Sequence, residues 1–253
     1  SRVVRGEGGY SENTRIKVME QVDVLGYLPN RLATVFAGDQ NSTFIGVSIP
    51  DLGNEVFAQV LEGIDRKLGT FGYQSVLGLT QHTQQQEENW IRTVLSWQPA
   101  GLILTGRYHS PRSTEMLRNS GIPVVEIMDV DGDAVDSVVG ISHRRAGREM
   151  AQEIIGRGHK RIGFLGTIMP LDHRARKRFE GFTEALAKAG LEVADKEFYS
   201  GGSALAKGRE MTAAMLSRTP DLDFLYYSND MIGMGGLLHC QDAGIDVPGQ
   251  IGL

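Results

Sequence analysis

Polar side chains that could bind a small ligand follow several apolar runs of this 253-residue chain. Thr105 and Arg107 follow the run GLILT, Asp129 follows IPVVEIM, and Asn229 follows DFLYYS. A guanidinium presents a planar fork that pairs with a carboxylate or with adjacent hydroxyls. Asparagine both donates and accepts hydrogen bonds, and a carboxylate accepts them, which suits sugar hydroxyls. These residue types indicate a site for a polar small molecule.

Structural roles could also explain some candidate residues. Asn229 precedes a helical run, and asparagine is a favoured helix cap. Arg178 lies in RKRFEGF, at the opening of a predicted helix after RIGFLG. It could be a solvated helix arginine beside Arg174, Arg176 and Lys177. From the residues alone, Asn229 and Arg178 could each contact a ligand or have only a structural role.

Motifs for covalent or cofactor chemistry fail when they are checked position by position. DVDGD (129–133) begins like a calcium loop, but Ala134 and Gly140 occupy the positions that need glycine and glutamate. GMGG (233–236) has Leu238 at the third glycine position of a dinucleotide loop. There is no G-x-S-x-G and no phosphate-binding G-x-x-x-x-G-K-[ST]. We therefore expect no cofactor, no metal and no enzymatic activity.

The elements that must position these residues form an alternating pattern from Phe44 onward. Apolar runs alternating with amphipathic helices are typical of a parallel sheet covered on both faces. Ligands bind such sheets at the carboxyl ends of the strands. The predicted strands are 44–50, 73–79, 101–105, 122–128, 137–141, 161–166 and 223–228, and helical spacing marks 57–68, 91–95, 150–155 and 179–186.

This pattern runs twice, which predicts an N-terminal lobe at 44–141 and a C-terminal lobe at 142–253. Two facing lobes form a cleft, and clefts are common ligand sites. Residues 1–43 differ: Ser11 is expected to cap a helix that ends near Gly26. Pro29 suits the start of a second helix, at 30–37, which at about two turns is marginal alone.

The overall composition and net charge exclude some classes of protein. The chain is 41% apolar and has a net charge of −5, which argues against binding nucleic acid with its whole surface. A small DNA-binding element on an acidic domain remains compatible with that charge. The single cysteine, Cys240, fits a reducing cytoplasm. We expect no membrane partner, because no apolar run reaches spanning length.

Several motifs in order and at matching spacing resemble the lactose/galactose-repressor family of transcription regulators. They include YSENTRIKVMEQVDVLGYLPNRLA, IGVSIPDLGNEVFAQVLEGI, GHKRIGFLG with RFEGF, and YYSNDMIGMGGL. The stretch AGLILT…HSPR…GIPVVEIMD is especially similar to gluconate-utilisation repressors within that family. The resemblance covers essentially the whole chain.

The resemblance implies an α/β fold of two doubly wound parallel-sheet lobes, like type I periplasmic binding proteins. A partial helix-turn-helix headpiece and hinge helix, 1–43, would precede the lobes. It further implies a cytoplasmic homodimer that binds operator DNA and a small effector, for which we expect a sugar acid such as gluconate. The alternatives are a periplasmic-type sugar-binding receptor, which lacks a hinge, and an enzyme.

For the DNA-binding end, the resemblance implies a hinge whose apolar side chain enters the minor groove. Phe36 stands at the position where the family usually has leucine, and a phenylalanine can unstack base steps. It could instead be a linker aromatic. Ser1 and Arg2 resemble the tail of the recognition helix, so weak DNA binding by this sequence alone is expected. The candidate DNA-binding residues are Arg2, Tyr27, Asn30, Arg31, Ala33 and Phe36.

For the effector, the resemblance implies contacts from both lobes. In the family an arginine in the context of Arg178 holds the effector, and Arg107 would be a second cation for a carboxylate. Ser142 and His143 stand where many members have Asp-Asn, a departure that could alter ligand choice. The candidate effector-binding residues are Asn54, Phe57, Thr105, Arg107, Asp129, Arg178 and Asn229.

Overall fold

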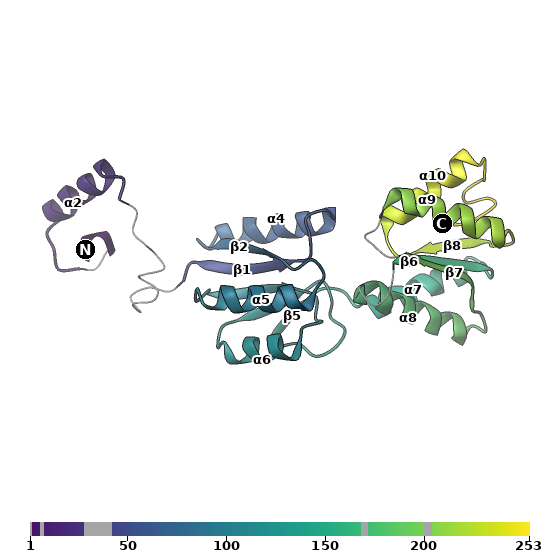
Figure 1. Ribbon diagram of the computed structural model, residues 1–253, viewed down its shortest axis with the longest axis horizontal. Coiled ribbons are helices and arrows are strands. Elements are labelled where there is room, and N and C mark those ends of the chain that lie inside the picture. The colour runs from purple at the N-terminus through teal and green to yellow at the C-terminus, as the bar shows by residue number, and fades with distance from the viewer. Residues whose placement is uncertain (1, 6–7, 28–41, 168–171, 200–203) are drawn as a thin grey trace.

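The computed structural model describes residues 2–5, 8–27, 42–167, 172–199 and 204–253. Most of these residues form two α/β lobes, each built around one sheet (Figure 1). Every strand pairs in parallel with its neighbours. The expected architecture of two parallel-sheet lobes is therefore confirmed.

The first lobe has a five-stranded sheet in the order β2-β1-β3-β4-β5. In Figure 1, α4 covers one face of this sheet, and α5 and α6 cover the other. The strands are β1 (Phe44–Ile49), β2 (Gln74–Leu79), β3 (Gly101–Thr105), β4 (Val124–Ile127) and β5 (Ser137–Val139), and the helices are α4 (Glu55–Gly69), α5 (Gln84–Leu95) and α6 (Pro111–Asn119).

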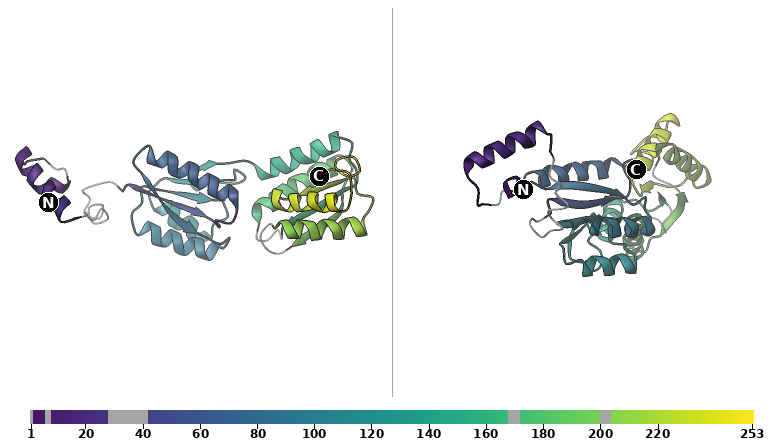
Figure 2. Two further views of the ribbon diagram at one scale, coloured as in Figure 1. Left: turned by 90° about the horizontal axis from the view of Figure 1, so that it is seen from above. Right: turned by 60° about the vertical axis from the view of Figure 1, so that its left-hand side comes forward.

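The second lobe has a three-stranded sheet in the order β7-β6-β8, extended by a parallel bridge from Phe224 to Gly252. Two helix pairs enclose it, α7 with α8 and α9 with α10 (Figures 1 and 2). Its strands are β6 (Ile162–Thr167), β7 (Val193–Tyr199) and β8 (Phe224–Tyr227), and its helices are α7 (His143–Gly156), α8 (His173–Lys188), α9 (Leu205–Arg218) and α10 (Asp230–Asp242).

Each lobe has its own apolar core. In the first, Ile91 and Val94 of α5 pack with Leu102 and Leu104 of β3. In the second, every residue of β6 is buried, because helices cover both faces of the central strand. In each lobe an apolar central strand thus lies between two helix layers. Polar residues follow the carboxyl end of that strand, outside the apolar core.

Glycines bring α7 and α8 unusually close together. A Cβ on Gly147 would overlap the carbonyl oxygen of Arg178, and one on Gly181 would overlap that of Arg144. The absence of side chains at these two positions therefore sets the distance between the helices. This contact matters for function because α8 carries Arg178.

Each run predicted as a strand contains one, but three elements were not predicted. β7 was missed because VADKEFY carries three charged residues and has no fully buried residue, as suits an edge strand. α6 has a detectable start signal, since Ser110 accepts from the backbone N–H of Ser113 and Pro111 follows it. α9 begins without a side-chain cap, so no local signal marks its start.

The N-terminal part contains α1 (Arg2–Arg5) and α2 (Glu12–Val24). As predicted, the Ser11 side chain accepts from the backbone N–H of Thr14 at 3.2 Å, and Gly26 follows the helix with φ of +58°. The second helix, predicted at 30–37, lies outside the described residues. The domain bounds 1–43, 44–141 and 142–253 stay predictions. Within the described ranges, no helix has the length and apolar character needed to cross a membrane.

Candidate ligand-binding site between the lobes

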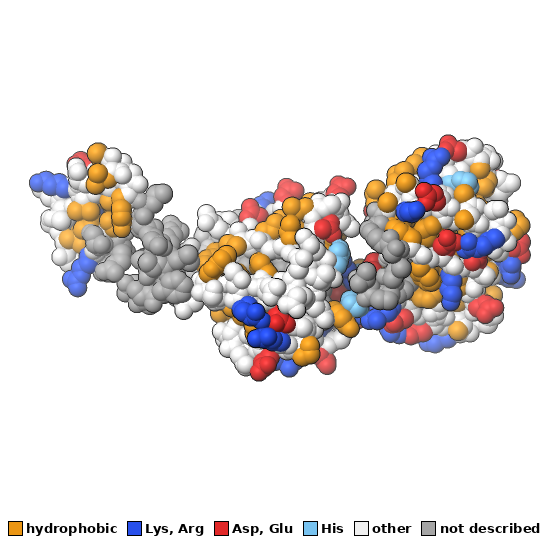
Figure 3. All heavy atoms as spheres, in the orientation of Figure 1, with side chains coloured by type: hydrophobic (Ala, Val, Ile, Leu, Met, Phe, Trp, Pro, Cys, Tyr) orange, Lys and Arg blue, Asp and Glu red, His pale blue; other side chains and the backbone are white. Residues whose placement is uncertain are grey.

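A cavity of about 600 Å³ lies between the lobes. Its first-lobe wall comes from segments that follow strands, with Pro50 after β1, Thr80 after β2 and Asp129 after β4. Its second-lobe wall comes from the start of α8. Figure 3 shows histidine and basic side chains at this junction on the visible face. The location matches the rule that parallel sheets bind ligands at strand carboxyl ends.

Thr105 and Arg107 both line the cavity at the end of β3. The hydroxyl of Thr105 donates to the carbonyl oxygen of Ser48 at 2.7 Å. The Arg107 side chain is 4% exposed, and its Nε lies 3.8 Å from Oε1 of Glu126, too far for a hydrogen bond. Nε and Nη2 of Arg107 have no hydrogen-bond partner among the described residues. A buried guanidinium with unused donors therefore stands at the cavity wall.

A buried charge cluster lies behind Arg107. Oε1 of Glu126 faces Nε2 of His109 at 3.2 Å, and Nδ1 of His109 faces Oε2 of Glu87 at 2.8 Å. Burial alone would lower the pKa of His109, but its bonds to Glu126 and Glu87 outweigh burial and raise that pKa to about 9. Likewise, burial opposes ionisation of Glu126, yet the His109 bond brings the pKa of Glu126 below its usual value. We conclude that His109 and Glu126 are both charged at neutral pH.

Asp129 is buried and connects the two lobes. Its Oδ1 accepts from the backbone N–H of Asp131 at 2.9 Å, and its Oδ2 pairs with the ammonium group of Lys177 on α8. Lys177 also donates to the carbonyl oxygen of Asp131 at 2.8 Å. The lysine thus ties the loop after β4 to the second lobe.

Arg178 and Asn229 are placed differently from Arg107, because neither lines the cavity. Nη2 of Arg178 donates to the carbonyl oxygen of Ser228 at 2.8 Å, and Nη1 lies 3.0 Å from Nδ1 of His143. His143 in turn bonds the carbonyl oxygen of Met128 through Nε2 at 2.8 Å. Asn229 caps α10 by accepting from the backbone N–H of Ile232 at 3.1 Å.

The His143 ring is held neutral by this arrangement. Burial and the neighbouring Arg178 cation lower the pKa of His143. With Nε2 facing a carbonyl and Nδ1 facing a guanidinium, the tautomer that fits carries its proton on Nε2. His143 therefore links Arg178 to the end of β4 across the lobe crossover.

Asn54 and Phe57 belong to the start of α4. The Asn54 side chain caps the helix by accepting from the backbone N–H of Val56 at 3.0 Å. Phe57 is buried, and the guanidinium carbon of Arg174 lies 5.0 Å from its ring centre. Between the lobes, the Tyr108 and His173 rings also stack at 3.6 Å. Arg174 and Lys177, considered from the sequence only as neighbours of Arg178, join the site, as do Tyr108 and His173, which no short motif singled out.

Among the DNA-binding candidates, Arg2 is exposed on α1, and Tyr27 is exposed just after α2. Asn30, Arg31, Ala33 and Phe36 lie outside the described residues. No group of three or more His, Cys, Asp or Glu side chains in the described ranges is arranged to hold a metal ion.

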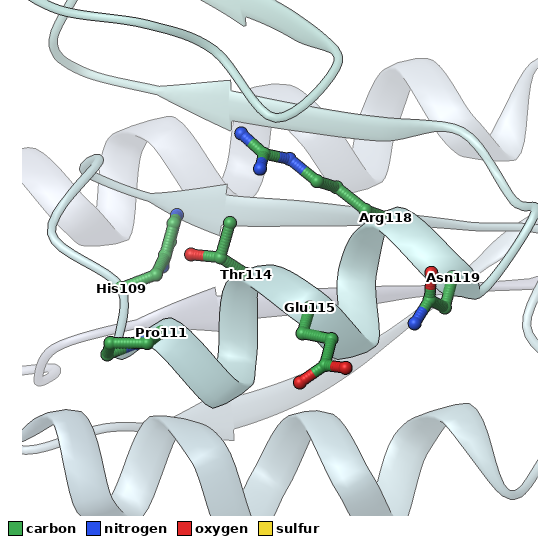
Figure 4. Close-up of a pocket in the computed structure, with 6 residues that line it drawn as sticks. All are labelled: His109, Pro111, Thr114, Glu115, Arg118 and Asn119. Carbon is green, nitrogen blue, oxygen red and sulfur yellow. The ribbon is translucent and has the colours of Figure 1, made fainter.

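A second hollow, of about 490 Å³, runs along the outer surface of α6. Its lining includes Glu115 and Arg118, which are exposed, and His109, which is buried (Figure 4). No described contact joins the two exposed side chains. The inter-lobe cavity is the better candidate site, because it lies at the carboxyl ends of the strands and is larger.

Two parallel-sheet lobes with a polar cavity between their strand ends define the class of small-molecule receptors with the periplasmic-binding-protein fold. The family model of periplasmic binding proteins and the sugar binding domain of the LacI family matches residues 42–253. The chain belongs to the LacI family of transcription regulators, not to an enzyme family. That membership agrees with the cytoplasmic location expected from the sequence.

Individual relatives support this assignment. The chain is 36% identical to the HTH-type transcriptional regulator GntR of Escherichia coli (strain K12), over all of this chain and 75% of that protein. A LacI-family regulator from Silicibacter pomeroyi has a crystal structure with 57% identity and a TM-score of 0.94, over 100% of this chain and 75% of that one. The lac repressor dimer bound to operator and anti-inducer shares only the fold, at 22% identity and a TM-score of 0.82 over 99% of this chain and 75% of that one.

Proposed function

We propose that this chain binds a sugar acid such as gluconate between its lobes, and that binding controls the affinity of a repressor for its operator. Arg107 carries the proposal. Its guanidinium is buried at the cavity wall with two donor nitrogens unused. Leaving such donors unpaired costs free energy, and a carboxylate accepts them in a bidentate arrangement.

The rest of the cavity suits the hydroxyls of such a ligand. Asp129 and Asp131 contribute carboxylates, and Lys177 contributes an ammonium group. The cavity volume, about 600 Å³, falls within the range of about 300–1,000 Å³ typical of small-molecule sites. The motif resemblance to gluconate-utilisation repressors points to the same ligand class.

Control of operator affinity would arise from the position of one lobe relative to the other. Lys177 contacts Asp129 across the cavity, and His173 stacks on Tyr108. An effector between these walls favours the lobe arrangement that it fits best, which is a population shift. We expect release of the operator on effector binding, by analogy with sugar-acid repressors.

The DNA-binding end is part of the same proposal. Residues 1–43 would form a partial headpiece and hinge, with Phe36 as the minor-groove wedge. Arg2, Tyr27, Asn30, Arg31 and Ala33 would contact DNA near it. The lobes, at 44–141 and 142–253, would dimerise so that paired headpieces meet a pseudo-palindromic operator.

The unfolding midpoint of the protein, measured with gluconate, related sugar acids, glucose and purines, tests the effector. At a hundred times its dissociation constant a ligand adds about 2.7 kcal/mol, or roughly 5–10 °C for a chain of this size. We expect this shift with gluconate or a close relative and none with glucose. A shift with glucose or purines alone would refute the sugar-acid assignment.

A periplasmic-type sugar receptor is the second candidate, because the matching family model covers both kinds of protein. The match of this whole chain to 75% of a transcription regulator favours the repressor. Fluorescence anisotropy on the regulator with its complete DNA-binding region separates the two. Only a repressor would change its operator affinity when gluconate is added.

A further inference from the structure

Arg107 stands beside a carboxylate to which it donates no hydrogen bond. Nε of Arg107 lies 3.8 Å from Oε1 of Glu126, although both side chains are almost fully buried. An arginine and a glutamate this close would ordinarily form a bidentate pair and use up the guanidinium donors. Something else must therefore satisfy Glu126.

Both oxygens of Glu126 are already used. Oε1 faces Nε2 of His109 at 3.2 Å, and Oε2 accepts from the backbone N–H of Val135 at 2.6 Å. The other ring nitrogen of His109 faces Glu87 at 2.8 Å. Because both ring nitrogens face carboxylates, both must donate, which requires the doubly protonated imidazolium.

The formal charges then balance within the cluster. Glu87 and Glu126 contribute two negative charges, and His109 and Arg107 contribute two positive charges. If His109 lost its charge, the cluster would carry a net negative charge beside the cavity. Glu126 would then attract the Arg107 guanidinium, and an anionic ligand would be repelled.

We propose that His109, which does not line the cavity, is a positioning residue that keeps the Arg107 guanidinium free for the carboxylate of an anionic effector. The inference rests on the proposed function, since it requires a carboxylate ligand in this cavity. It adds a residue that acts on the ligand only through Glu126 and Arg107.

The groups that face His109 come from three elements. Glu87 lies on α5 and Glu126 on β4, while Glu115 and Arg118 of α6 share the outer hollow that His109 borders (Figure 4). No described hydrogen bond or ion pair joins either α6 residue to His109. Glu87 and Glu126 therefore set its protonation.

Two substitutions that change the charge of the cluster in opposite directions test the inference. His109→Gln removes the cation and retains an amide that can hydrogen-bond, whereas Glu87→Gln removes an anion from the same cluster. Isothermal titration calorimetry with gluconate at pH 7.5 is expected to show binding weakened about tenfold or more in His109→Gln. In Glu87→Gln, gluconate should bind more tightly, because Glu87 also lines the cavity and its negative charge is removed.

Neutral gluconamide serves as the matched ligand, and its affinity should change less than about threefold in either variant, because it lacks the charge. The control variant is His159→Gln, since His159 also faces a carboxylate, Asp223 at 3.6 Å, but lies outside the cavity. Parent affinity for gluconate should also fall as pH rises through about 9, and that of His109→Gln should not.

The outcomes separate this inference from the proposed function. If the parent binds no sugar acid, the proposed effector class is wrong and this inference falls with it. If the parent binds gluconate but both cluster variants weaken it alike, the cluster is only structural and this inference alone is overturned. Should His109→Gln fail to fold, the sign of the Glu87→Gln effect still decides.

Discussion

The surroundings of Arg107 differ from those of an arginine in an ordinary structural ion pair. A buried arginine in a stable core is normally paired, because an unpaired buried charge costs several kcal/mol. Here two of its donor nitrogens have no partner among the described residues. Such a residue lowers stability, and the unused donors are those that a carboxylate ligand would satisfy.

Replacing Arg107 with methionine should therefore separate binding from stability. We expect gluconate affinity to fall roughly 10- to 100-fold, since a hydrogen bond to a charged group contributes about 1.5–3 kcal/mol. The unfolding midpoint should change little, because the unused buried donors are removed together with the electrostatic contact to Glu126. Calorimetry and thermal unfolding measure the two effects.

The matched control is Arg112→Met, because Arg112 is exposed and its Nε lies 3.6 Å from Glu88. It should leave both gluconate affinity and the midpoint unchanged. A midpoint several degrees lower for Arg107→Met, with gluconate binding retained, would assign Arg107 a structural role instead.

His109 should make folding stability depend on pH. Its folded-state pKa of about 9 lies above the usual 6.5, so folding takes up a proton between these values. The stabilisation, roughly 3 kcal/mol by linkage, is fully present below pH 6.5 and is lost as pH rises through about 9. Urea unfolding at pH 6, 7.5 and 9.5 measures the free energy of unfolding of the parent and of His109→Gln. The difference between the two should shrink as pH rises, and a difference that stays constant with pH would contradict this titration.

At the scale of elements, α8 organises the second-lobe wall of the cavity. Its N-terminal half contributes His173, Arg174 and Lys177, each of which contacts the first lobe. Arg178, one residue further on, instead contacts His143 at the start of α7 and the carbonyl oxygen of Ser228 after β8. The position of α8 is set by its close glycine contact with α7.

A methyl group at Gly147 should force α7 and α8 apart. The new Cβ would overlap backbone of α8 at Arg178, which cannot move without shifting the helix. Overpacking of this kind costs about 1–3 kcal/mol, and at roughly 2–4 °C per kcal/mol the unfolding midpoint of Gly147→Ala should drop visibly.

The control lies on the same helix. A Cβ on Gly156 would meet nothing within 4 Å, so Gly156→Ala should be neutral or stabilise by up to about 1 kcal/mol. Equal midpoints for the two variants, measured by circular dichroism, would show that the helices separate without strain.

The Lys177–Asp129 ion pair joins α8 to the loop after β4 in the other lobe, and it should raise the free energy of unfolding. Asp129 is almost fully buried, so Lys177→Met leaves a buried carboxylate without its cation, at a cost of about 1–3 kcal/mol. The midpoint should fall by several degrees. Arg145→Met, which removes an exposed pair with Glu149 on α7, should leave it unchanged. Similar midpoints for both variants would mean that the pair does not hold the lobes.

At the scale of the whole molecule, the inter-lobe contacts link two independently packed cores. The stack of Tyr108 on His173 and the pair of Asp129 with Lys177 each join the two walls of one cavity. A ligand between these walls adds contacts to both lobes at once. Its effect should therefore extend along the cavity and not into the cores.

Hydrogen exchange can map this effect over the molecule. With saturating gluconate we expect slower amide exchange at 129–133 and 172–178, because ligand contacts suppress local opening there. α2 should serve as an internal reference with unchanged exchange. If the slower exchange caused by gluconate is lost in Arg107→Met, the ligand binds in the cavity. If the variant shows the same slowing as the parent, the ligand binds elsewhere.

Local patterns predicted much of the framework. The apolar runs at 44–50 and 161–166 are strands because continuous apolar segments suit sheets buried on both faces. The same reasoning placed Thr105, Arg107 and Asp129 at one edge, where they line a common cavity. It failed for β7, whose charged residues suit a partly exposed edge strand and conceal its β character.

The sequence by itself thus determined the alternation of strands and helices, the edge of the sheets at which polar residues gather, and the family. Only the tertiary structure decided which of those residues are free to bind. Asn54 and Asn229 use their side chains as helix caps, while Arg107 keeps unused donors. The physical reason is distance along the chain. His109 lies 22 residues after Glu87 and 17 residues before Glu126, and only packing of α5 against β3 and β4 brings their charges together.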